Sequence, residues 1–334
     1  MPPADRPVLA IASLGGTITM TPQADGGIVP TLQAADLVAA VPGLDVVADL
    51  RAATLAARPS ASLTETDVLQ AVDWARDEVD RGAVGAVIVQ GTDTLEETSF
   101  LADCVWEHNQ PLVFTGAMRG AAQASADGPG NLLASAMVAA SPQARGLGAV
   151  VVLDDVVHRA ALVHKAHTTA LSAFASYGGQ VAGRVVEGEV WLTPAGPRLP
   201  ARRLPVDAEL GFVPICSTYL GDDGRVLRRL LADDPAGIVI AGFGAGHVSE
   251  LMAEVVSAAV ERCPVVVASR IGQGGTTRRT YGFSGSEIDL QRRGAIMAGT
   301  LDAVKSRVLL ALLVAAGVDN AGIAAEFGRR AVRY

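Results

Sequence analysis

Two short stretches of the chain combine a buried-strand pattern with side chains that can do chemistry. Residues 11–18 (IASLGGTI) contain Thr17, and residues 87–98 (VIVQGTDTLEET) contain Thr92 and Asp93. Apolar, β-branched runs predict strands covered on both faces, and glycine at a strand end permits a sharp turn or the close approach of a ligand. Because ligands of open α/β sheets bind at the carboxyl ends of strands, these stretches predict one shared site. The alternative is two ordinary strand-to-helix turns, with Asp93 and Glu96 forming a capping box.

Threonine is a weak nucleophile and needs a base beside it. The best candidate for that base is Lys165, because the chain contains only one other lysine, Lys305, and otherwise uses arginine. A lysine amine can accept a proton in a dry pocket, whereas an arginine guanidinium cannot. Thr17, Thr92 and Lys165 therefore indicate hydroxyl and amine chemistry, with an ordinary surface lysine as the alternative.

The other motifs do not indicate a cofactor or a metal. The glycines at 242, 244 and 246 resemble a dinucleotide loop, but His247 follows directly, so the GxGxxG spacing is not met. His158, His164 and His167 lie close in sequence without a carboxylate or cysteine that would complete a metal site. We expect no cofactor and no bound metal.

Composition excludes several classes of function. Half of the residues are apolar and 19% are charged, which permits a large core, and the net charge of -8 with scattered basic residues argues against nucleic acid as a partner. Three distant cysteines, none in a CxxC motif, do not form a disulfide framework. The polar start (1–6) does not have the pattern of a secretory signal, and the longest late apolar run (308–318) is shorter than the stretch expected to cross a membrane. We therefore expect a cytoplasmic protein that does not bind membranes.

Strand and helix patterns alternate along the chain, which predicts an α/β fold with a doubly wound, mostly parallel sheet. Residues 192–211 contain four prolines and no periodicity, which indicates a linker. We predict a larger amino-terminal α/β domain (1–191), a linker (192–211) and a smaller, flavodoxin-like α/β domain (212–334). The expected strands are 8–12, 86–89, 112–115, 149–153, 212–216, 237–242 and 265–269, and the expected helices are 32–40, 64–81, 96–108, 131–140, 249–262 and a final one over 302–316.

These motifs together resemble those of the bacterial-type L-asparaginases, amidohydrolases that convert asparagine to aspartate and ammonia. The similarity covers nearly the whole chain in order. Its segments are residues 15–18 (GGTI), 91–98 (GTDTLEET), 116–119 (GAMR), 125–132 (SADGPGNL), 165–169 (KAHTT), 242–246 (GFGAG), 265–270 (VVVASR) and 305–310 (KSRVLL).

The resemblance implies a role for each matching residue. Thr17 would be the nucleophile that forms an acyl-enzyme, and Thr92, Asp93 and Lys165 would form a relay that activates water. Asp93 would also bind the α-ammonium group of the substrate, and Ser60 its α-carboxylate. The remaining substrate-binding positions are Ala61, Gly91, Ala117, His247 and Glu287. In the family a neighbouring subunit supplies the last two, so the resemblance implies a homotetramer built as a dimer of dimers.

The chain departs from the family pattern at three places. Leu14 replaces a threonine, His247 stands where many members have asparagine, and residues 18–30 contain no tyrosine, although the family's loop there usually carries one that activates the nucleophile. Two classes of function therefore remain open. The leading one is hydrolysis of L-asparagine, with glutamine or another ω-amide as the runner-up substrate, and the other is a weakly catalytic ligand-binding paralogue.

Overall fold

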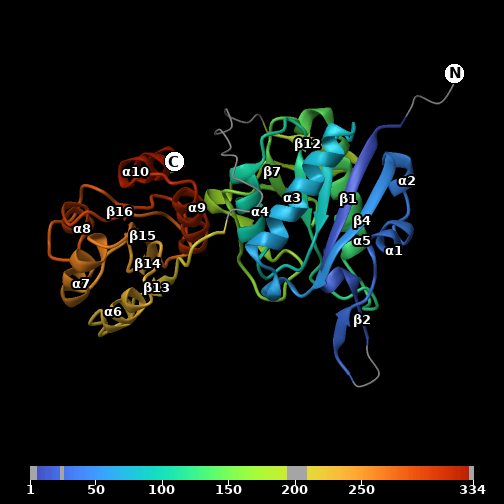
Figure 1. The fold of residues 1–334 in the computed structure, drawn as a ribbon. Helices are drawn as coiled ribbons and strands as arrows, with labels where there is room; N and C mark the ends of the chain where they lie inside the picture. The colour runs from blue at the N-terminus through green and yellow to red at the C-terminus, as the bar shows by residue number, and fades with distance from the viewer. Residues whose placement is uncertain (1–5, 23–25, 194–208, 331–334) are drawn as a thin grey trace. The chain divides into compact units, whose positions relative to one another are not determined.

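The computed structural model describes residues 6–22, 26–193 and 209–330. The chain divides into two compact units, one within residues 1–206 and the other within residues 207–334 (Figure 1). Both units are α/β, so the expected fold class is confirmed. Of the expected linker, residues 194–208 lie outside the described residues, whereas Leu192 is the last residue of a strand. The domain boundaries at 191 and 212 stay predictions.

The first unit is built around an eight-stranded sheet with the order β12-β11-β8-β7-β6-β5-β1-β4. Five of its strands are parallel, namely β4 (Asp49–Arg58), β1 (Val8–Gly15), β5 (Ala86–Val89), β6 (Leu112–Thr115) and β7 (Ala149–Leu153). Three antiparallel strands extend the sheet, namely β8 (Val156–Arg159), β11 (Gly183–Val186) and β12 (Glu189–Leu192).

The strand order reverses beside β1. The chain passes from β1 to β4 on one side and then returns to β5 on the other, and β1 and β5 pair in parallel from Ala10 with Ala86 to Ser13 with Val89. Ligands of doubly wound sheets bind where the order reverses, outside the carboxyl ends of the strands. The fold therefore directs attention to the ends of β1 and β5.

Helices cover both faces of this sheet (Figure 1). The helices α3 (Glu65–Asp80) and α4 (Leu95–Val105) pack on one face, and α5 (Gly128–Ala140) packs on the other with α1 (Ala34–Ala39) and α2 (Leu44–Val47). The central strands are buried along their whole length, and Val87 and Val89 enter the core under α5. Continuous apolar sequence in these strands is therefore the direct consequence of two covered faces.

Two short hairpin sheets complete the first unit. One pairs β2 (Met20–Pro22) with β3 (Ile28–Pro30), and the other pairs β9 (Val163–Lys165) with β10 (Phe174–Ser176). Lys165 is the last residue of β9, so a separate hairpin, not the main sheet, presents this side chain.

The second unit has a four-stranded parallel sheet in the order β13 (Ile215–Ser217), β14 (Ile238–Gly242), β15 (Val265–Ser269) and β16 (Ile296–Met297). One core joins this sheet to α6 (Arg225–Ala232), α7 (Glu250–Val260) and α8 (Glu287–Arg292). The apolar helix α9 (Ala303–Ala315) packs on β13, β14 and β15, and α10 (Asn320–Arg330) contacts β16. The expectation that the helix over 302–316 is the last one is wrong, because α10 follows it.

Candidate active site

The end of β1 requires glycine at two consecutive positions. Gly15 and Gly16 have φ angles of 105° and 88°, in the region that favours glycine. A side chain at Gly16 would also overlap the backbone of Gly91 at the end of β5. The contact between these two backbones places Thr17, which is half-buried at the start of a 3-10 turn over residues 17–19, beside the second strand end.

Ser60 joins the end of β5 to the segment that follows β4. Its Oγ accepts a hydrogen bond from the Asp93 backbone N at 3.1 Å, and its carbonyl accepts one from Thr94 Oγ1 at 3.1 Å. A Cβ at Gly91 would lie 2.6 Å from Ser60 Oγ, so Gly91 permits this approach. Ser60 is buried, and its neighbour Ala61 is exposed. Three strand ends therefore meet at this point.

Lys165 completes a hydroxyl–amine–carboxylate cluster. Its Nζ donates to Thr92 Oγ1 at 2.9 Å and to Asp93 Oδ1 at 2.7 Å. Thr92 is buried, the Lys165 side chain is 17% exposed and the Asp93 side chain is 66% exposed. An ion pair this accessible adds little stability, so its main effect is to orient the amine against the threonine hydroxyl. The exposed side of the Asp93 carboxylate is accessible to a ligand.

The capping-box alternative for Asp93 and Glu96 is wrong. The N-cap of α4 is Thr94, which makes no side-chain cap hydrogen bond. Asp93 accepts from the Lys165 amine, and Glu96 Oε2 accepts from the Lys165 backbone N at 3.1 Å. One short segment therefore contacts Lys165 at two points, its amine and its backbone N, and Glu96 belongs to this cluster although the sequence suggested only a capping role for it.

The end of β6 lies next to the same cluster. A Cβ at Gly116 would lie 3.4 Å from the Thr92 side chain, and Ala117 beyond it is 1% exposed. The structure therefore brings Ser60, Gly91, Ala117 and the Lys165 cluster to one edge of the sheet, where Gly91 also contacts Gly16.

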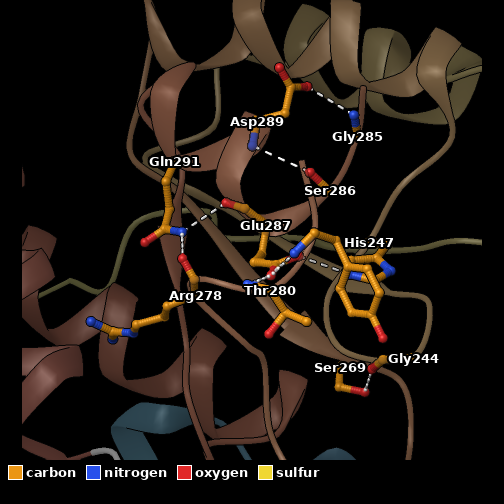
Figure 2. A network of polar contacts seen from close by, with 11 residues as sticks. Gly244, His247, Ser269, Arg278, Thr280, Gly285, Ser286, Glu287, Asp289 and Gln291 are labelled. Atoms are coloured by element: carbon orange, nitrogen blue, oxygen red, sulfur yellow. Dashed lines mark hydrogen bonds and ion pairs between the residues drawn. The ribbon is translucent and has the colours of Figure 1, made fainter. Parts of the chain in front are cut away.

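In the second unit His247, which lies in the loop after β14, contacts Glu287, the first residue of α8 (Figure 2). Glu287 Oε2 lies 3.1 Å from His247 Nε2, and Oε1 accepts from the Thr280 and Tyr281 backbone N atoms at 2.7 and 2.8 Å. The His247 ring makes T-shaped contacts with the rings of Tyr281 and Phe283, at 5.0 and 5.2 Å between ring centroids. Both Glu287 oxygens thus have partners within the unit.

The environment of Glu287 favours its ionised form. Burial by itself raises the pKa of this carboxyl, but the hydrogen bonds from Tyr281, Thr280 and His247 outweigh that effect and lower the pKa below its usual range. The side chain has no exposed surface in the single chain. Glu287 therefore fixes the His247 ring and the backbone at residues 280–281.

The three histidines near Lys165 have separate surroundings. His158 is buried on β8 beside Ser176 Oγ at 2.9 Å, His164 stacks on Tyr177, and His167 Nδ1 accepts from the backbone N atoms of residues 169 and 170. Burial lowers the pKa of His158 to about 4, with further lowering from the charges of Arg184 and His164.

In the described ranges, no group of three or more His, Cys, Asp or Glu residues has a metal-binding arrangement. Among the helices of those ranges, none is long and apolar enough to cross a membrane.

Two family models match the two units of the chain. The family model for the asparaginase N-terminal domain matches residues 8–196, and the glutaminase/asparaginase C-terminal domain matches residues 212–327. The chain belongs to the asparaginase family.

Individual relatives align over almost the full chain. A probable L-asparaginase of Deinococcus radiodurans is 34% identical, and the alignment covers 97% of this chain and 98% of the relative. A probable periplasmic L-asparaginase of Haemophilus influenzae is 31% identical over 92% and 89% of the two chains. The crystal structure of a probable cytoplasmic L-asparaginase from Campylobacter jejuni has a TM-score of 0.86 and 28% identity, and the match covers 96% of this chain and 99% of that one.

Proposed function

We propose that the protein is an L-asparaginase, which hydrolyses the side-chain amide of L-asparagine to give L-aspartate and ammonia. The observation that carries this proposal is the Lys165 amine, which bonds to Thr92 at 2.9 Å and to Asp93 at 2.7 Å beside the strand end that presents Thr17. The names of the family relatives support the choice of substrate.

The reaction follows in two steps. The Thr17 oxygen attacks the amide carbon, the Thr17 hydroxyl proton passes to the amide nitrogen, and the C–N bond breaks, so that ammonia leaves and an ester links the acyl group to Thr17. A water molecule that the Thr92–Lys165–Asp93 relay deprotonates then attacks the ester and releases aspartate, and Thr17 regains its proton. Backbone N–H groups at Gly91 and Thr92 stabilise the oxyanion in both steps.

The remaining residues bind the substrate. The exposed Asp93 carboxylate pairs with the α-ammonium group, and Ser60 and Ala61 bind the α-carboxylate. Ala117 contacts the side-chain amide. His247, oriented by the buried Glu287, completes the pocket from a neighbouring subunit of a homo-oligomer, which we infer to be a dimer of dimers.

We place the protein in the cytoplasm. Cys104, Cys216 and Cys263 are buried thiols, which suits a reducing compartment. No metal or cofactor has a role in this mechanism, because every step uses side chains and backbone groups of the chain.

The experiment that tests the proposal is ammonia release by the purified protein with L-asparagine, L-glutamine and D-asparagine. We expect turnover of L-asparagine in the presence of a chelator. Faster turnover of L-glutamine would identify the protein as a glutaminase. Binding of L-asparagine without release of ammonia would identify a ligand-binding paralogue instead.

A further inference from the structure

Ala117 has a buried backbone with unmet hydrogen-bonding capacity. The residue is 1% exposed, and no hydrogen bond to its carbonyl occurs within the described part of the chain. Buried backbone carbonyls in folded proteins almost always have a partner. A carbonyl in this position, next to Gly116 and the Thr92 side chain, is an acceptor that a bound ligand can use.

Asn131 anchors the peptide group before Ala117. Its Nδ2 donates to the Gly116 carbonyl at 3.0 Å and to Asp127 Oδ2 at 3.0 Å, and its Oδ1 accepts from the Asp154 backbone N at 2.9 Å. Asn131 is 4% exposed. One amide therefore links the ends of β6 and β7 to the first turn of α5.

Asp127 anchors the chain after Ala117. Its two carboxylate oxygens accept from the backbone N atoms of Met118 and Arg119, each at 2.8 Å. Hydrogen bonds from backbone N–H groups to an ionised carboxylate are short and stronger than those between neutral groups. Together with Asn131, Asp127 fixes the peptide on each side of Ala117 and leaves the Ala117 carbonyl itself without an internal donor.

We propose that Asp127 and Asn131 are positioning residues that aim the Ala117 carbonyl at the amide nitrogen of the substrate. This inference rests on the proposed amidohydrolase function. In the ground state the carbonyl accepts an N–H of the carboxamide. As the C–N bond breaks the nitrogen gains a proton and positive charge, so the same hydrogen bond strengthens in the transition state and favours departure of ammonia. The pair thereby selects amides over other acyl derivatives.

An ester substrate separates this role from general support of the fold. In the β-methyl ester of L-aspartate, a methoxy group replaces the NH₂ group, so the leaving group has no N–H to donate to Ala117. The acyl carbon, the α-ammonium and the α-carboxylate are unchanged. Interactions with Thr17, Thr92, Asp93 and Ser60 are therefore common to both substrates.

The experiment compares kcat/KM for L-asparagine and for this ester in Asn131→Ala and Asp127→Asn. We expect each variant to lose about tenfold on the amide, because one hydrogen bond that strengthens in the transition state is misdirected, and less than about threefold on the ester. Both substrates are measured on the same sample, so the ratio of the two losses does not depend on the fraction of protein that is folded.

Asp103→Asn is the matched control. The Asp103 carboxylate also accepts from a backbone N, that of Ala149 at 3.0 Å, but at the start of β7, the opposite end of the sheet. This variant should lower the melting temperature without changing the amide-to-ester ratio.

Three outcomes overturn the inference. Equal losses on the two substrates would mean that Asp127 and Asn131 only support the fold, and full activity on both would mean that the Ala117 carbonyl needs no such support. A wild-type protein that releases no ammonia from any amide would contradict the proposed function itself, and the inference with it. The first two results leave the asparaginase assignment intact, so the two failures are distinguishable.

Discussion

At the scale of single residues, the proposed chemistry depends on Lys165. Its amine is shared between the hydroxyl of Thr92 and the carboxylate of Asp93, and its backbone N is bound by Glu96. These contacts hold Lys165 both at its backbone and at the amine that ends its side chain. Side-chain entropy that a long, flexible lysine would otherwise retain is therefore removed before the substrate arrives, as expected of a preorganised catalytic group.

We predict that Lys165→Arg lowers kcat at least about 100-fold, because a guanidinium can pair with Asp93 but, unlike a lysine ammonium, does not give up its proton and so cannot become the neutral base that the relay needs. The measurement is ammonia release from L-asparagine at saturating substrate, with the melting temperature as a check on folding. Since the positive charge is kept, the fold should survive. Near-normal turnover by a folded variant would remove Lys165 from the relay.

The sequence predicted some of these residues and missed others for a physical reason. Thr92, Asp93 and Lys165 were found because their types suit the chemistry and their motifs resemble a known family. Glu96 was considered only as part of a capping box, since its contact with Lys165 joins residues that are 69 positions apart in the chain. An acidic residue in the first turn of a helix has the same sequence signature whether it caps that helix or contacts a distant strand.

At the scale of elements, burial decided which strands the sequence could predict. The strands β5, β6, β7 and β15 have the expected bounds, because each is an apolar run buried on both faces. By contrast, β4 is mostly exposed at the sheet edge, and its sequence DLRAATLAAR has no apolar face to detect. The antiparallel strands β8, β11 and β12 have four residues each, too few for a period to be recognised.

The strand β8 provides a prediction about pH, because it buries His158. The pKa of this histidine is about 4 in the folded protein against an ordinary value of 6.5. Between these values the unfolded chain binds a proton that the folded chain does not, so the free energy of unfolding falls as the pH drops from 6.5 toward 4. We predict that His158→Gln removes roughly 2 kcal/mol of the stability difference between pH 7.5 and pH 5.

Tryptophan fluorescence during urea unfolding measures this difference in the correct part of the molecule. Trp74, Trp106 and Trp191 all lie in the first unit, so their signal follows the unfolding of that unit. Carboxylates titrate alike in the two proteins, and their contribution cancels in the comparison. If the variant loses as much stability on acidification as the wild type, His158 does not carry the effect.

At the scale of the whole molecule, the candidate residues are divided between two compact units. Thr17, Thr92, Asp93 and Lys165 belong to the first unit, and His247 and Glu287 belong to the second. The sequence predicted two α/β units from the alternation of strand and helix patterns. It could not predict that Glu287 has both oxygens occupied by its own unit, because those bonds come from the path of the loop at residues 280–281.

The division leads to a prediction about assembly. If the second unit completes the pocket of a neighbouring chain, Thr17→Ala and Glu287→Ala affect opposite partners of each shared site. In a mixed dimer one site then contains both substitutions and the other contains neither. Each variant alone should be inactive, the first through loss of the nucleophile and the second because His247 loses its carboxylate partner.

Activity should return when the two inactive proteins are mixed and allowed to exchange subunits. With random exchange about half of the dimers are mixed, and each has one intact site of two, so the mixture should recover about a quarter of the wild-type activity. His247→Ala in place of Glu287→Ala repeats the test without removing a buried carboxylate, and circular dichroism checks that each variant is folded. A mixture that exchanges subunits yet stays inactive would contradict the shared site, and so would a fully active monomer, because in a monomer only the chain's own second unit can complete the pocket.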